Sequence, residues 1–166
     1  MTTRKKWLAH DFFPPPFAFE LYADVYKSSN YAMAVHEAAH AVLNEKLGYE
    51  VRRVELNGSN GVTEAKASQN LHHVITIAYA GYVASSRTID EEYAHENSLH
   101  DYDIINGELI KIEESQWKEV CKNCKETCER LVEENWRRIQ NVATVLAENK
   151  KLTGDQVRKI ISDTKV

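Results

Sequence analysis

The sequence predicts a mainly helical protein with one small β-hairpin, which is an α+β fold. Apolar residues recur at helical spacing through most of the chain beyond residue 30, whereas alternating β-branched character is confined to residues 51–65. A length of 166 residues fits one domain with a substantial core. We therefore expect one domain over residues 31–166, with residues 1–30 forming an extended segment that packs on it.

The N-terminal segment and the first helix have distinct signatures. Residues 12–17 place three prolines between phenylalanines, which is typical of an extended, polyproline-like strap. In residues 31–47 the apolar positions follow a helical period, with Ser29 or Asn30 available as an N-terminal cap and Gly48 as a stop. These apolar positions are Tyr31, Ala34, Val35, Ala38, Val42 and Leu47.

A hairpin and further helices follow in order. Residues 51–56 and 62–65 read as two strands joined by the turn formers at 57–61. Residues 69–86 read as a helix, 87–97 as a charged loop, and a helix begins near Ser98, which stands at capping-box spacing from Asp101. A long helix is expected over 116–150, and a last one begins where Thr153 precedes Gln156 by three residues.

Composition excludes several classes of function. The formal charge of −4 argues against nucleic acid as the main partner, and the longest nearly uncharged stretch, residues 71–86, is shorter than the roughly 20 apolar residues of a membrane span. The basic start leads into prolines rather than into an apolar signal segment. Three cysteines, an odd number, do not suggest a disulfide framework, so we expect a cytoplasmic protein without a membrane segment.

The pentapeptide at residues 36–40 carries most of the functional information. It reads His-Glu-Ala-Ala-His, the H-E-x-x-H pattern, within the first expected helix. Positions i and i+4 of a helix lie one above the other, so His36 and His40 can bind one ion while Glu37 stands beside it as a general base. The alternative is a chance match in which both histidines are polar positions on an amphipathic helix.

The order of elements resembles the peptidase domain of the FtsH family of zinc metalloproteases over residues 31–162. The family motif is H-E-A-G-H, so this chain departs from it at Ala39. Gly61-Val62-Thr63 resembles the start of the family's second strand, and Gly81 with Ala84 resembles its next helix. The resemblance implies a zincin-type helical domain that hydrolyses peptide bonds with Zn²⁺. Since the chain has no G-x-x-x-x-G-K-[ST] loop, we expect it to act without its own ATPase domain.

A catalytic zinc site usually has three protein ligands and one open position. The resemblance points to an aspartate, and the segment Asp103-Ile104-Ile105-Asn106-Gly107 matches the family's ligand segment best. Gly107 would then allow a neighbouring helix to approach. Asp101 is the second candidate, and either aspartate could instead be an ordinary acid at a helix start. A glutamate ligand would come from a further set, namely Glu91, Glu92 and Glu96.

The implied reaction is zinc-assisted peptide hydrolysis. With His36, His40 and Asp103 holding zinc, the metal lowers the pKa of a water molecule and Glu37 accepts its proton. A peptide or a flexible protein segment would lie as an added strand along the hairpin edge. The residues expected to contact it are Val62, Thr63 and Glu64.

Two other interpretations remain open. The chain could be a catalytically idle relative that keeps the fold as a protein-binding or metal-binding module, although a binding module has no chemical need for Glu37. It could also be a metal or redox sensor built on Cys121, Cys124 and Cys128. Their spacing of three, then four, continues an apolar helical stripe, which favours buried core thiols.

Overall fold

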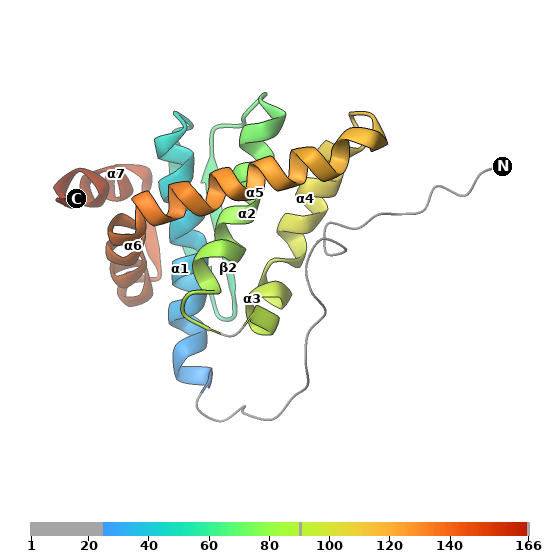
Figure 1. Ribbon diagram of the computed structural model, residues 1–166. Coiled ribbons are helices and arrows are strands. Elements are labelled where there is room, and N and C mark those ends of the chain that lie inside the picture. Colours follow the sequence, from blue (N-terminus) through green and yellow to red (C-terminus); the bar gives the residue numbers. More distant parts are fainter. Residues whose placement is uncertain (1–24, 90, 166) are drawn as a thin grey trace.

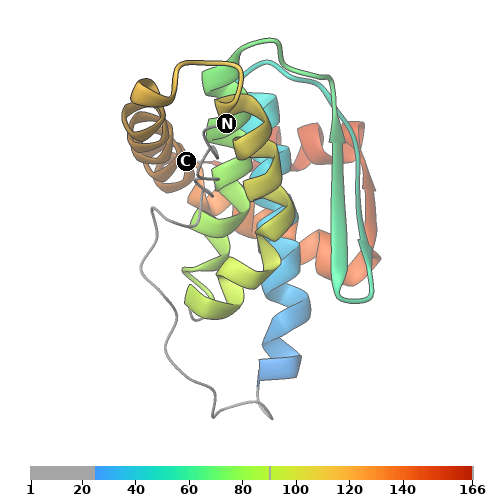
Figure 2. The ribbon, with the colours of Figure 1, turned by 90° about the vertical axis from the view of Figure 1, so that its right-hand side faces the viewer.

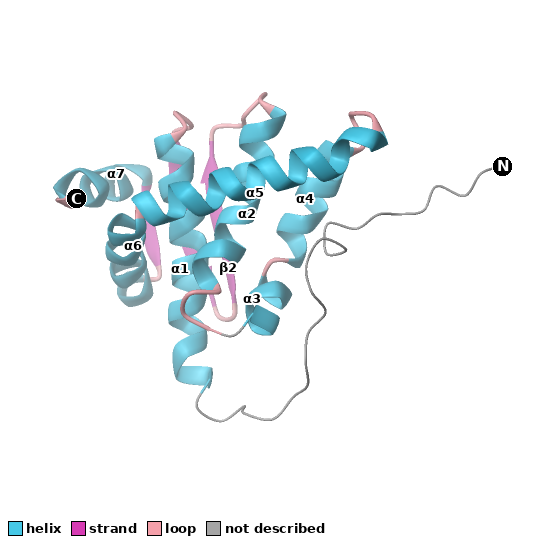
Figure 3. Ribbon diagram, viewed as in Figure 1, coloured by secondary structure: helices cyan, strands magenta, loops and turns pink. Residues whose placement is uncertain are grey.

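The computed structural model describes residues 25–89 and 91–165 (Figure 1). Of the extended segment expected over residues 1–30, residues 1–24 lie outside this part, and residues 25–30 belong to helix α1 instead. The described elements are α1 (Val25–Lys46), β1 (Val51–Asn57), β2 (Asn60–Ala65), α2 (Leu71–Ser85), α3 (Glu91–Asn97), α4 (Leu99–Leu109), the short 3₁₀ turn η2 (Glu114–Gln116), α5 (Trp117–Glu134), α6 (Trp136–Asn149), β3 (Lys151–Thr153) and α7 (Gly154–Asp163). The prediction of a mainly helical α+β protein is confirmed (Figure 3).

Helix α1 runs through the centre of the molecule. It packs against α2 and α6 and against strand β2, while α5 lies across the far side of α2. Figure 2 shows the resulting layers, with the sheet on one side, α5 on the other, and α1 and α2 between them. Small residues permit this close packing, since Ala34, Ala38 and Ala39 have no exposed surface. The residues of the H-E-A-A-H motif therefore lie inside the protein.

The ends of α1 agree only partly with expectation. The helix begins at Val25, so the predicted caps at Ser29 and Asn30 are wrong, because both residues lie within the helix. Its end is as predicted: the chain leaves the helix through Gly48 at φ +85°, a left-handed conformation that glycine adopts without strain. The Tyr49 amide then donates to the Asn44 carbonyl at 2.8 Å.

The predicted hairpin forms, and a third strand joins it. Strands β1 and β2 are antiparallel, and Gly58 at φ +60° lies in the turn between them. Residues 151–153, not expected as a strand, pair with the other edge of β1, giving the order β2-β1-β3. Within the described residues, β2 is thus an edge strand whose outer side pairs with no other strand.

Several expected boundaries shift. The expected loop at 87–97 contains helix α3, and the expected long helix divides at Asn135, whose side-chain amide donates to the Leu131 carbonyl at 2.9 Å. Ser98 forms no capping box, because its hydroxyl donates to the Ala94 carbonyl. The capping box of Thr153 with Gln156 is confirmed, and it begins α7.

The cysteines are part of the core. Cys121, Cys124 and Cys128 are buried free thiols on α5, the helix that packs on α2. Burial raises the pKa of the Cys128 thiol well above its usual range, which keeps it protonated. The interpretation as buried core thiols is thus confirmed. Among the described helices, none combines the length and the apolar character that a bilayer span requires.

Candidate metal centre

The two histidines of the motif converge, as the i, i+4 spacing predicts. His36 is 4% exposed and His40 is 8% exposed, and their rings meet edge to face. The two Nε2 atoms are 3.1 Å apart. The rings therefore do not lie on an exposed polar face of the helix, as the chance-match interpretation would have placed them.

Asp101 brings a carboxylate to the same point. Its Oδ2 lies 3.1 Å from His36 Nε2 and 3.4 Å from His40 Nε2, and its side chain is almost fully buried. In the part of the chain that is described, His36, His40 and Asp101 are the one group of three metal-ligand side chains whose atoms lie close together. The alternative glutamates Glu92 and Glu96 are not in this group, and the side chain of Glu91 lies outside the described part.

The expectation that Asp103 is this carboxylate is corrected to Asp101. Asp103 is exposed, because two residues further along a helix turn the side chain by about 200° to the opposite face. A signal for the correct choice exists in the sequence: Tyr102, Ile105 and Leu109 are the inner apolar positions of α4, and residue 101 borders that stripe. The expected close approach at Gly107 is also wrong, since a Cβ there would meet nothing within 4 Å.

The spacing of the three atoms fits a tetrahedral ion. Zinc bonds of about 2.0–2.2 Å at tetrahedral angles place neighbouring ligand atoms about 3.3–3.6 Å apart. The three distances here, between the Nε2 atoms of His36 and His40 and Asp101 Oδ2, are 3.1, 3.1 and 3.4 Å. Two imidazole nitrogens and one carboxylate oxygen are also a donor set that zinc accepts, so the residues fit such an ion.

Helix α2 orients His40. The Ile77 carbonyl accepts a hydrogen bond from His40 Nδ1 at 2.9 Å, so in the neutral ring the Nε2 lone pair is free to bind a metal. Burial lowers the pKa of His40, but the Asp101 carboxylate outweighs it and raises the pKa to about 9. Burial likewise raises the pKa of Asp101, and His40 and His36 outweigh it and hold the pKa well below its usual range.

Gly81 makes room for the other imidazole. A Cβ at this position of α2 would overlap the His36 ring, at 2.5 Å from Nδ1 and closer still to two other ring atoms. His36 Nδ1 is buried and has no hydrogen-bond partner among the described residues. The ring is therefore held by polar contacts at Nε2, whereas on its Nδ1 side it is positioned by packing.

Glu37 points to the other side of α1, toward the sheet. It is 5% exposed, and the Thr63 hydroxyl of β2 lies 2.7 Å from its Oε2 and 3.0 Å from its main-chain carbonyl oxygen. Gly61, two residues earlier on β2, packs against the carboxylate and its Cγ, where a Cβ would lie 2.6 Å from Oε1. Strand β2 therefore contacts the proposed base at two positions, through a hydrogen bond from Thr63 and through close packing at Gly61.

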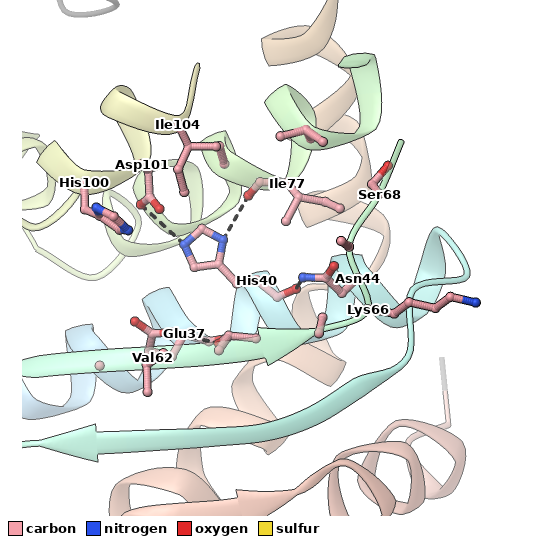
Figure 4. Close-up of a pocket in the computed structure, with 16 residues that line it drawn as sticks. Glu37, His40, Asn44, Val62, Lys66, Ser68, Ile77, His100, Asp101 and Ile104 are labelled. Atoms are coloured by element: carbon pink, nitrogen blue, oxygen red, sulfur yellow. Dashed lines mark hydrogen bonds and ion pairs between the residues drawn. The ribbon is translucent and has the colours of Figure 1, made fainter. Parts of the chain in front are cut away.

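A pocket of about 310 Å³ opens onto the site. Figure 4 shows His40 at its centre, Glu37 and strand β2 on one wall, and Asp101 with His100 and Ile104 of α4 on the other. Most of the remaining lining is apolar or small and comes from β2, the segment after it and α2: Gly61, Val62, Thr63, Ala65, Ala67, Val74, Ile77 and Ala78, with the polar Asn44, Lys66 and Ser68.

Two of the three expected substrate contacts lie at the pocket. Val62 and Thr63 line the pocket, but Glu64 does not, and its carboxylate pairs with Arg53 at 2.6 Å on the exposed face of the sheet. His100 lines the pocket as a neighbour of Asp101, whereas His95 meets the Tyr102 hydroxyl at 3.1 Å, away from the pocket.

Comparison with family models and with curated proteins gave no match for this chain. The likeness to the FtsH peptidase domain therefore stays a resemblance of motif and element order.

Proposed function

We propose that this protein is a zinc-dependent peptidase in which His36, His40 and Asp101 hold the ion and Glu37 is the general base. The observation that carries the proposal is the convergence of three buried ligand atoms at 3.1–3.4 Å from one another, within about 0.2 Å of the spacing that zinc requires. Glu37 supports it, because this residue lines the same pocket as His40 and Asp101.

Each group has a chemical task. Bound at this site, zinc supplies a lowered pKa for water and a polarised substrate carbonyl. Glu37 accepts a proton from the attacking water and delivers it to the nitrogen of the leaving amine, while the peptide C–N bond breaks. Ile77 keeps the His40 ring in the required tautomer through its carbonyl.

The substrate is a peptide or a flexible protein segment. The outer edge of β2 offers main-chain hydrogen-bonding groups beside the pocket, so an extended peptide can pair with this strand whatever its sequence. The apolar lining from Val74, Ile77 and Ile104 favours an apolar side chain next to the cleaved bond. The proposal includes activity without an ATPase domain, and the three free thiols favour a reducing compartment such as the cytoplasm.

Metal analysis with matched variants tests the proposal. The metal-free chain is loaded with zinc, and bound zinc and cleavage of fluorescein-labelled casein are measured together. We expect one zinc per chain, with Asp101→Asn losing at least tenfold in zinc affinity and Asp103→Asn, the exposed neighbour, retaining it. Glu37→Gln should keep zinc and lose 10²- to 10⁴-fold in cleavage rate.

The same experiment separates the alternatives. Zinc bound without cleavage of casein or of a mixed peptide library by the unaltered chain would favour the idle binding module. Equal zinc affinity in Asp101→Asn and in the unaltered chain would refute the assigned ligand set.

A further inference from the structure

The structure assigns a second role to strand β2: we propose that Thr63 is a positioning residue that holds Glu37 Oε2 and leaves Oε1 as the oxygen that carries the proton. This inference rests on the proposed function, because it concerns the base of that reaction. It differs from the expectation that Thr63 contacts the substrate.

The two carboxylate oxygens of Glu37 have different surroundings. Oε2 accepts a hydrogen bond from the Thr63 hydroxyl at 2.7 Å. No described residue donates to Oε1, and this oxygen is not among the buried polar atoms that lack a partner, so it keeps some exposed surface on a residue that lines the pocket. The carboxylate is thus fixed through one oxygen and available through the other.

Gly61 keeps the second oxygen open. Any side chain at this position would begin 2.6 Å from Oε1, inside van der Waals contact, and would cover or displace it. The side chains of residues 61 and 63 lie on one face of the strand, since residues two apart in a strand point the same way. One strand face therefore combines a hydroxyl for Oε2 with an empty position beside Oε1.

Thr63 can serve both protonation states of the base. Its hydroxyl has one hydrogen and lies within hydrogen-bond distance of two acceptors, Glu37 Oε2 and the Glu37 main-chain oxygen at 3.0 Å. With the carboxylate charged, the hydroxyl donates to Oε2. After Oε1 has taken the proton from water, the hydroxyl can turn to the main-chain oxygen without being left unpaired. When that proton passes to the amine nitrogen and the C–N bond breaks, the first arrangement returns.

The consequence is that the base and the substrate share one strand. The same β2 whose outer edge would pair with a peptide also holds the carboxylate through Thr63. A shift of β2 would move the base relative to the ion. Misplacement of a catalytic group by about 1 Å costs on the order of 10²-fold in rate, so this contact is expected to matter for kcat.

Variants at Thr63 test the inference by kinetics. Thr63→Val keeps the shape and removes the hydroxyl, Thr63→Ser restores it, and Thr144→Val removes an exposed threonine hydroxyl on α6 as the matched control. With the zinc-loaded chain and the casein-derived peptide that it cleaves fastest, we expect Thr63→Val to lower kcat about tenfold or more with KM within twofold. Thr63→Ser should recover most of kcat, and all variants should keep one zinc.

A second measurement does not depend on catalysis. In the metal-free chain, Thr63→Val should lower the urea midpoint of unfolding, and should lower it less when Glu37→Ala is already present, because the two side chains are hydrogen-bonded. Equal losses in both backgrounds would refute the contact. A raised KM with unchanged kcat in Thr63→Val would overturn the inference and indicate that Thr63 contacts the substrate. An inactive Thr63→Ser variant would also overturn it and indicate that Thr63 acts only by packing. If the unaltered chain cleaves nothing, the proposed function fails, while the unfolding data still decide the Thr63–Glu37 pair.

Discussion

Replacing Gly81 by alanine should weaken zinc binding, because the new methyl group would displace the His36 ring. The added methyl carbon would lie 2.5 Å from His36 Nδ1, whereas ordinary contacts between side-chain atoms are about 3.5–4.0 Å. Either the His36 ring must therefore move by about 1 Å, or helices α1 and α2 must move apart by about this distance. Ligand positions in a metal site are specified to about 0.2 Å, so this displacement is several times what the site tolerates.

The expected result is a loss of at least tenfold in zinc affinity, measured by competition with a chromophoric chelator. The fold itself should lose about 1–3 kcal/mol from overpacking, offset in part by the helix preference of alanine over glycine, about 1 kcal/mol. Gly107→Ala is the matched control: it lies in a helix with nothing within 4 Å of the new methyl group. That variant should keep its zinc affinity and gain about 0.5–1 kcal/mol.

Zinc affinity in Gly81→Ala equal to that of the unaltered chain would refute the argument that packing against α2 fixes the His36 ring. A loss of the same size in both glycine variants would point instead to a general effect of helix stability on the site. Circular dichroism at the assay temperature establishes that each variant is folded before zinc is added.

Two further predictions concern the protons of the site and the thiols. Zinc needs neutral His40, and because Asp101 raises the pKa of His40 to about 9 in the ion-free chain, zinc affinity should keep rising about tenfold per pH unit from pH 6.5 to 9 in a chelator titration, rather than level off near 6.5. The free energy of unfolding of the metal-free chain should change in the opposite direction with pH. The pair of protonated His40 and charged Asp101 stabilises this chain below pH 6.5, and the stabilisation is lost as the pH rises through 9. A zinc affinity that is flat above pH 7 would contradict this assignment. Cys128→Ser should destabilise the chain by about 1–3 kcal/mol in urea unfolding, because it buries a hydroxyl in an apolar core, and leave zinc stoichiometry unchanged. Loss of zinc in this variant would support a thiol-based site instead.

Local sequence patterns were sufficient where one element fixes the answer. The i, i+4 spacing of His36 and His40 required only that residues around them form a helix, which the apolar period of the same stretch indicates. The hairpin followed in the same way from its turn formers, and the start of α7 from the pair Thr153 and Gln156. In each case the interacting residues are near neighbours in the chain.

Local patterns were insufficient where an outcome depended on packing between elements. An unbroken helical period runs past Asn135, so periodicity does not reveal the division of α5 from α6. Strand β3 is three residues long and exists because β1 offers an edge to pair with. The third acid is an intermediate case: the apolar stripe of α4 indicates that residue 101 is on the inner side, but its distance from the two histidines depends on how α4 packs against α2.

The sequence by itself therefore determined the helix that presents two imidazoles and a carboxylate, because these groups lie within five residues and their directions follow from helix geometry. Only the tertiary structure decided three contacts: the approach of Asp101 to the histidines, the packing of Gly81 against the His36 ring and the hydrogen bond from Thr63 of β2 to Glu37. These contacts join residues 26 to 65 positions apart. Their existence depends on how α1, α2, α4 and the sheet pack as whole bodies, which no short window of sequence encodes.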